Sequence, residues 1–128
     1  MITCADIISY LDTNYNYKDS LSVLSNNKKI NYTTIAYDFD KIKYCIYRDN
    51  CASADALLIK RNLNLIEFKT GFSSPEDNAD DKLRKENLVL KIRAKAYESL
   101  HLLETAIIDE ISENDTLDKN VKITFCAV

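Results

Sequence analysis

The chain has 128 residues, of which 46% are hydrophobic and 29% are charged, and its formal net charge is −3. This length suits one globular domain, and the composition is ordinary for a folded protein. No stretch approaches the roughly 20 apolar residues of a membrane span, and no signal-peptide pattern opens the chain, so we expect a cytoplasmic protein without a membrane partner. One His and four Cys without C-x-x-C spacing argue against a zinc site and indicate reduced thiols.

Two short helices are predicted near the N-terminus. Ile7 and Leu11 are spaced as on one face of a helix, which would run from Thr3 to Leu11 with Thr3 as its cap. Ser20 is placed to cap a second helix that ends near Leu24.

Two strands are expected next, over Ile30 to Phe39 and Lys41 to Arg48. The second run alternates apolar and more polar residues, which is typical of a half-buried strand. The apolar positions are Ile42, Tyr44 and Ile46. Asp38 and Asp40 fall between the two runs. They either form a simple turn or lie near an acidic site, and the sequence leaves both alternatives open.

The stretch from Ser53 to Gly71 predicts a β-hairpin, because two runs rich in Leu and Ile flank the polar pair Arg61-Asn62. A three-residue loop over Arg61 to Leu63 would pair Lys60 with Asn64.

That register places three charged side chains together. Asp55 would stand opposite Lys69 and diagonal to Glu67, at about 5 and 7 Å between Cβ atoms. Two carboxylates and an ammonium on one face suit a hard divalent cation with an adjacent positive charge. The alternative is a solvated hairpin face that carries the same charges.

Asp55, eleven intervening residues and then Glu67-Phe68-Lys69 resemble the core signature of the PD-(D/E)XK nuclease superfamily. The resemblance implies that Asp55, Glu67 and the backbone carbonyl of Phe68 bind Mg²⁺ or Mn²⁺, while Lys69 assists the attacking water. It also implies an α/β fold in which helices flank a mixed central sheet. The implied core order is helix, three strands, long helix, strand.

Members of this superfamily often add a Glu from the first helix to the metal site. No Glu precedes Glu67 in this chain, so Asp6 is the candidate auxiliary acid, with Asp12 as the other choice.

A long helix is predicted from about Asp80 to Ile111, interrupted, if anywhere, near Glu86-Asn87. Its apolar residues recur every three or four positions, which would cover one face of a sheet. They are Val89, Ile92, Ala96, Leu100, Leu103, Ile107 and Ile111.

Basic residues gather in the first half of this predicted helix and are the candidates for binding the nucleic-acid backbone, although a solvated helix face is the equal alternative. These are Lys82, Arg84, Lys85, Lys91 and Lys95.

Val121 to Val128 predicts a last strand, which ends the sequence without a polar tail and indicates either a central strand or a chain shortened at its C-terminus.

Residues 1–128 are expected to form one PD-(D/E)XK-like domain. The predicted function is that of a metal-dependent endonuclease that hydrolyses phosphodiester bonds, with DNA as partner and a homodimer expected where both strands of a duplex are cut. The alternative is a non-catalytic module that binds nucleic acid or protein, or inhibits a partner, on the same scaffold.

Overall fold

A computed structural model describes residues 1–26, 32–47, 53–68 and 79–128, and all structural statements concern these ranges. The elements, in chain order, are α1 (Cys4–Asn14), β1 (Lys18–Ser20), α2 (Leu21–Leu24), β2 (Ile35–Asp38), α3 (Phe39–Tyr47), β3 (Ala56–Ile59), β4 (Leu63–Glu67), α4 (Ala79–Leu102), the π-helical turn η1 (Leu103–Ile108), α5 (Asp109–Ile111) and β5 (Ile123–Ala127). None of the helices in these ranges is long and apolar enough to cross a membrane.

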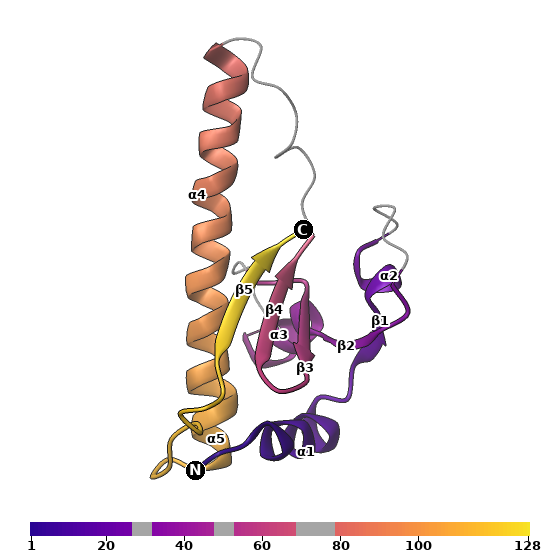
Figure 1. The fold of residues 1–128 in the computed structure, drawn as a ribbon, viewed down its shortest axis with the longest axis vertical. Coiled ribbons are helices and arrows are strands. Elements are labelled where there is room, and N and C mark those ends of the chain that lie inside the picture. The colour runs from indigo at the N-terminus through magenta and orange to yellow at the C-terminus, as the bar shows by residue number, and fades with distance from the viewer. Residues whose placement is uncertain (27–31, 48–52, 69–78) are drawn as a thin grey trace.

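The five strands form one mixed sheet in the order β1-β2-β3-β4-β5. The first three pairings are antiparallel, whereas β5 runs parallel to β4. A parallel pair needs a long crossover connection, and α4 lies in the connection between β4 and β5. The structure therefore confirms the expected α/β class, with a mixed sheet, flanking helices and a long helix before the last strand. Figure 1 shows α4 beside the sheet and projecting well beyond it.

Side chains alternate between two apolar layers along the central hairpin. On one face the main core packs sheet residues against α1, α3 and the end of the long helix. Its members include Ile7, Phe39, Leu57, Leu63, Leu65, Leu103 and Ile107. On the other face a smaller cluster lies under α2. It contains Leu21, Ala36, Ala56, Ile66 and Phe68.

The local helix signals of the sequence are confirmed. Thr3 and Asp6 form a reciprocal capping box at the start of α1. The Ser20 side chain accepts the backbone N–H of Val23 at 3.3 Å and so caps α2. The long helix runs from Ala79 through η1 to Ile111 without the break considered near Glu86-Asn87.

The strand predicted over Lys41 to Arg48 is wrong, because the described part of this segment, residues 41–47, belongs to α3. Phe39 and Ile42 are fully buried and lie three residues apart, which is a helical spacing. The apolar residues of this segment therefore fit the period of a helix as well as that of a strand. The Asp38 carboxylate accepts the backbone N–H of Lys41 at 3.1 Å, which is the geometry of a helix N-cap. This local bond favours the helix.

The predicted hairpin register is also wrong: the turn begins one residue earlier than expected, so Asn64 pairs with Leu58 and not with Lys60, a shift of two residues. Ile59 pairs with Leu63, and the turn consists of the three residues between them. Leu63 is 0% exposed, so its burial in the core explains why it joins β4 instead of the loop. The Asn62 side chain accepts the backbone N–H of Lys122 at 2.9 Å and anchors the turn to the chain before β5.

Leu57 and Leu58 offer a direct test of the two layers. We expect Leu57→Ala to lower the free energy of unfolding by about 2–5 kcal/mol, because Leu57 is fully buried in the main core. Leu58 is half-buried against the smaller cluster, so Leu58→Ala should cost less than half as much. Urea unfolding of both variants measures the difference, and equal losses would contradict the assignment of faces.

Candidate functional site

Three acidic positions lie at one end of the sheet because adjacent strands alternate in direction. Asp38 ends β2, Asp55 directly precedes β3 and Glu67 ends β4. Asp38 pairs with Ala56, and Ala56 pairs with Ile66, so the three positions follow one another across the strands. The topology thus brings to one end of the sheet backbone positions that lie up to 29 residues apart in sequence.

Asp55 binds the backbone of the neighbouring elements at this end. Its N–H donates to the carbonyl of Ile66 at 2.9 Å, and its carbonyl accepts the N–H of Phe39 at 3.3 Å. The Asp55 carboxylate accepts the backbone N–H of Phe68 at 2.8 Å. Asp55 therefore lies against the Glu67-Phe68 segment. The observed register sets it beside Glu67, whereas the predicted register set it opposite Lys69.

Glu67 is turned towards α4. Its side chain is 1% exposed, and its Oε1 accepts a hydrogen bond from Lys95 Nζ at 2.7 Å. Ser99, one helical turn after Lys95, accepts the backbone N–H of Ala54 at 2.7 Å. Lys95 and Ser99 thus attach α4 to the end of β4 and to the approach to β3.

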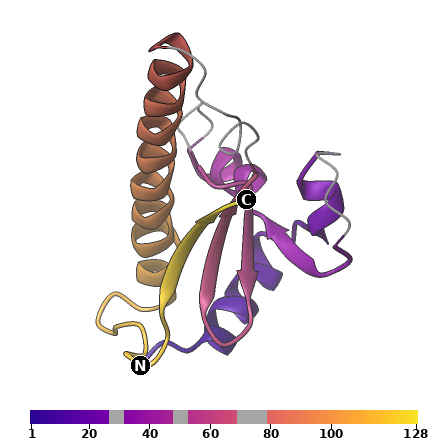
Figure 2. The same ribbon diagram turned by 45° about the horizontal axis from the view of Figure 1, so that its top comes forward.

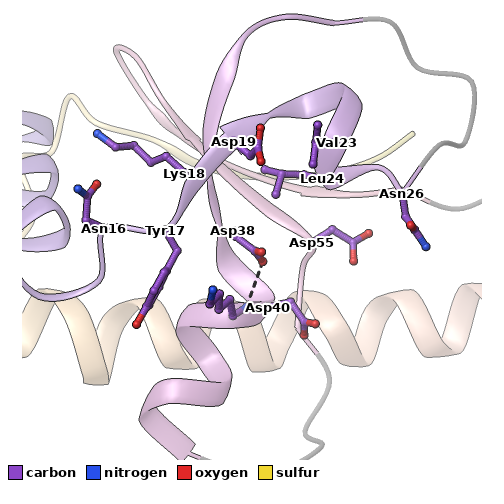
Figure 3. A pocket seen from close by; sticks show the side chains of 11 residues that line it. Asn16, Tyr17, Lys18, Asp19, Val23, Leu24, Asn26, Asp38, Asp40 and Asp55 are labelled. Carbon is purple, nitrogen blue, oxygen red and sulfur yellow. Dashed lines mark hydrogen bonds between the residues drawn. The ribbon is translucent and has the colours of Figure 1, made fainter.

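A pocket of about 510 Å³ opens on the opposite side of this sheet end, next to α2 and the start of α3. Figure 3 shows Asp38, Asp40 and Asp55 around it, with Asp19 across from them. Lys18 and Lys41 also line the pocket, whereas Glu67 is not among its described lining residues. The structure therefore brings Asp55 into a cavity with Asp38 and Asp40, and holds Glu67 on the α4 side.

The pocket concentrates negative charge. Burial, followed by the nearby carboxylates of Asp40 and Asp55, raises the pKa of Asp38, although the N–H of Lys41 partly offsets the rise. Asp40 accepts a hydrogen bond from Ser53 Oγ at 3.1 Å and lies 3.3 Å from the buried ammonium of Lys43. The sequence left open whether Asp38 and Asp40 form a simple turn or lie near an acidic site. In the structure Asp38 caps α3, Asp40 lies in its first turn, and both line the acidic pocket.

The remaining predicted site residues are dispersed. Lys69 lies outside the described residues. Asp6 is engaged in the capping box of α1, where the backbone N–H and hydroxyl of Thr3 lower its pKa. Asp12 accepts the Tyr37 hydroxyl at 2.7 Å and pairs with Lys18 at 2.9 Å. Neither Asp6 nor Asp12 lines the pocket.

The basic residues of α4 do not form one row. Arg84 and Lys91 line one shallow groove along the helix, and Lys82 and Lys85 line another. Lys95 points inward to Glu67. The candidates for nucleic-acid contact are thus divided between two sides of α4, with Lys95 in a different role.

The donor chemistry fits a hard divalent cation, since Asp55, Glu67 and the Phe68 carbonyl offer only oxygen ligands. Burial raises the pKa of Asp38 most, and the carboxylates of Asp40 and Asp55 add to the rise; a cation nearby would offset this second contribution. In the described ranges no three His, Cys, Asp or Glu side chains are close enough together to form a metal-binding group.

The pairing of Lys95 with Glu67 was not foreseen from the sequence. The two residues are 28 positions apart, and their contact depends on the rotation of α4 about its axis. One local signal existed, because Lys95 and Ser99 are polar residues on the face of α4 that is turned towards the sheet.

Searches of protein-family models, curated proteins and solved structures found no match to this chain.

The ion pair predicts a specific stability effect. Lys95→Met should lower the free energy of unfolding by about 1–3 kcal/mol, because it removes the ammonium from a buried carboxylate. Adding Glu67→Gln should recover part of the loss, since the remaining side chain is neutral. Lys82→Met, an exposed change on the same helix, should stay within about 0.5 kcal/mol of wild type in chemical denaturation. A Lys95→Met variant as stable as Lys82→Met would refute the role of this pair.

Asp38 predicts a pH-dependent effect. Its raised pKa means that the ionised form is penalised in the folded state at neutral pH, and that protonation removes the penalty. Asp38→Asn keeps a side chain that can cap α3 and should raise the melting temperature by roughly 1–3 °C at pH 7. The gain should shrink as pH falls through the raised pKa and vanish below about pH 4, the ordinary range for Asp.

Thermal scans across pH 3.5 to 7.5 measure this difference. Asp19→Asn is the control, because Asp19 lines the same pocket without capping a helix. A gain for Asp38→Asn that grows towards low pH would have the wrong sign.

Proposed function

We propose that this protein is a metal-dependent nuclease that hydrolyses phosphodiester bonds in DNA. The observation that carries the proposal is the meeting of Asp55 with the Glu67-Phe68 segment at the end of the central hairpin, through the 2.8 Å bond from the Phe68 N–H to the Asp55 carboxylate. A first helix, antiparallel strands with α2 and α3 between them, a long helix and a parallel last strand support the resemblance to the PD-(D/E)XK superfamily.

In this proposal Asp55, Glu67 and the carbonyl of Phe68 hold Mg²⁺ or Mn²⁺. The cation supplies Lewis acidity to the attacking water and offsets charge on the phosphodiester. Asp55 is held in place by backbone bonds to β4 and α3, so the chain fixes this ligand before any cation arrives. Lys69 is the residue that the motif assigns to the attacking water.

Lys95 gives this site a feature of its own. Its ammonium already neutralises Glu67, so a divalent cation must share that carboxylate with it. Lys95 would therefore compete with a bound cation for Glu67, and its ammonium would add positive charge to the site. This use is an alternative to direct contact with the nucleic-acid backbone.

The same ion pair favours a second candidate function. The Glu67 side chain is 1% exposed and is paired with Lys95, and a residue with a purely structural role would have the same surroundings. On that basis the chain would be a non-catalytic module that binds nucleic acid or protein, and the hairpin motif would serve only stability.

Cleavage assays separate the two functions. We expect wild type to cut DNA with Mg²⁺ or Mn²⁺, and Asp55→Ala or Glu67→Gln to lower the rate at least about a hundredfold, because each removes a ligand to the cation. Single-stranded, double-stranded and branched DNA, and RNA, define the substrate. Asp19→Asn, which changes the neighbouring pocket, is the control. Full activity in both ligand variants would exclude the proposed site.

Metal affinity tests the competition at Glu67. Lys95→Met should bind Mn²⁺ more tightly than wild type, roughly threefold to thirtyfold in Kd by calorimetry, because no ammonium competes for Glu67. The Lys95→Met/Glu67→Gln double variant should lose the gain. Unchanged affinity in Lys95→Met would show that Glu67 does not ligate the cation.

A further inference from the structure

From Leu83 onward, α4 carries a second stripe of apolar residues, on the face turned away from the domain. Leu83, Leu90 and Tyr97 recur every seven residues and are 56, 60 and 74% exposed. The exposed residues Asn87 and Ala94 lie between them. His101 completes the series, in which the spacing alternates between four and three residues. This is the a/d pattern of a coiled-coil seam.

The face towards the sheet is a separate set of residues on the same helix. Ile92 is half-buried, Lys95 reaches Glu67, and Ser99 and Leu102 are buried. At about 100° per residue, this inner set lies roughly 150° around the helix from the exposed seam. The domain therefore covers one side of α4 and leaves the seam open, in agreement with the sheet lying to one side of α4 in Figure 2.

Charges beside the seam complement a second copy in one orientation. In a parallel coiled coil each g position faces the e position five residues later in the partner. With Leu83 and Leu90 at d, Glu86 then faces Lys91 of the second copy, and Arg93 faces Glu98. Two-fold symmetry doubles both pairs, so four contacts join opposite charges.

An antiparallel arrangement is less favourable. In an antiparallel pair with the same seam, Asn87 of one copy packs against Leu90 of the other. Glu86 then lies beside Arg93 of the other copy, which is favourable, but Arg84 lies beside Lys91, and both are positive. Like charges side by side destabilise the pairing. Asn87 also favours the parallel form, because an Asn at a single a position meets its own counterpart there and fixes the register.

We propose that the exposed seam of α4, from Leu83 to His101, is a dimerisation surface that forms a parallel two-stranded coiled coil with a second copy of this chain. Because the domain lies on the far side of each helix, the two domains point away from each other and do not collide. Lys91 and Arg93 then act in the interface. The inference is independent of the proposed catalytic site.

Two adjacent residues give a matched test of the seam. Leu90 lies on it, and Val89, 39% exposed, lies off it. Sedimentation equilibrium of wild type should show a concentration-dependent dimer. Leu90→Glu should raise the dimer Kd at least about tenfold, while Val89→Glu should stay within about twofold of wild type. A wild type that remains monomeric at about 1 mM, or a Val89→Glu variant as weak as Leu90→Glu, overturns the proposal.

Charge exchange tests the orientation. Glu86→Lys should weaken the dimer several-fold, and adding Lys91→Glu should restore it, because these positions face each other only in the parallel form. Rescue by Arg93→Glu instead would indicate antiparallel helices and overturn the assignment. Circular dichroism of each variant checks that the domain is folded, and a folded Glu86→Lys variant that dimerises as tightly as wild type also contradicts it.

Discussion

The ion pair between Glu67 and Lys95 joins the two elements on which the rest of the fold depends. β4 is hydrogen-bonded to β3 on one side and to β5 on the other. α4 is part of the crossover connection that lets β5 run parallel to β4. The 2.7 Å contact fixes the rotation of α4 against the end of β4, with Ser99 one turn later. The contact lies on the same side of α4 as the buried Ser99 and Leu102, so it belongs to the face that the domain covers.

Fixing α4 in this way separates the charges at the end of the sheet. On the α4 side, Glu67 is neutralised by Lys95. On the α2 side, Asp38, Asp40 and Asp55 share a pocket in which the pKa of Asp38 is raised. The Asp55 carboxylate connects the two sides through its bond to the Phe68 N–H. This uneven distribution of charge supports the proposed cation site at the junction, since functional sites are where perturbed carboxylates concentrate.

Local signals in the sequence predicted local structure well. The Thr3 and Ser20 caps and the long helix depend on neighbouring residues, and the structure contains all of them. Asp55 and Glu67 were predicted as site residues from the spacing of the nuclease-like motif. Non-local contacts account for the errors. α3 was read as a strand because its apolar residues fit both periods, and the hairpin register followed the polar turn residues instead of the buried Leu63. The contact of Lys95 with Glu67 depends on the rotation of α4 about its axis, and the two residues lie 28 positions apart, so no short sequence window contains it.

The most direct measurement is a crystal structure of the whole chain with Mn²⁺, in which anomalous scattering locates the cation. The account predicts one Mn²⁺ site at about 2.1 Å from oxygens of both Asp55 and Glu67, with the Lys95 ammonium beside the shared carboxylate. Anomalous density confined to the Asp38 and Asp40 side of the pocket would contradict the assignment of Glu67. A structure at saturating Mn²⁺ with no such density, and with Lys95 still bound to Glu67, would contradict the metal-dependent function itself.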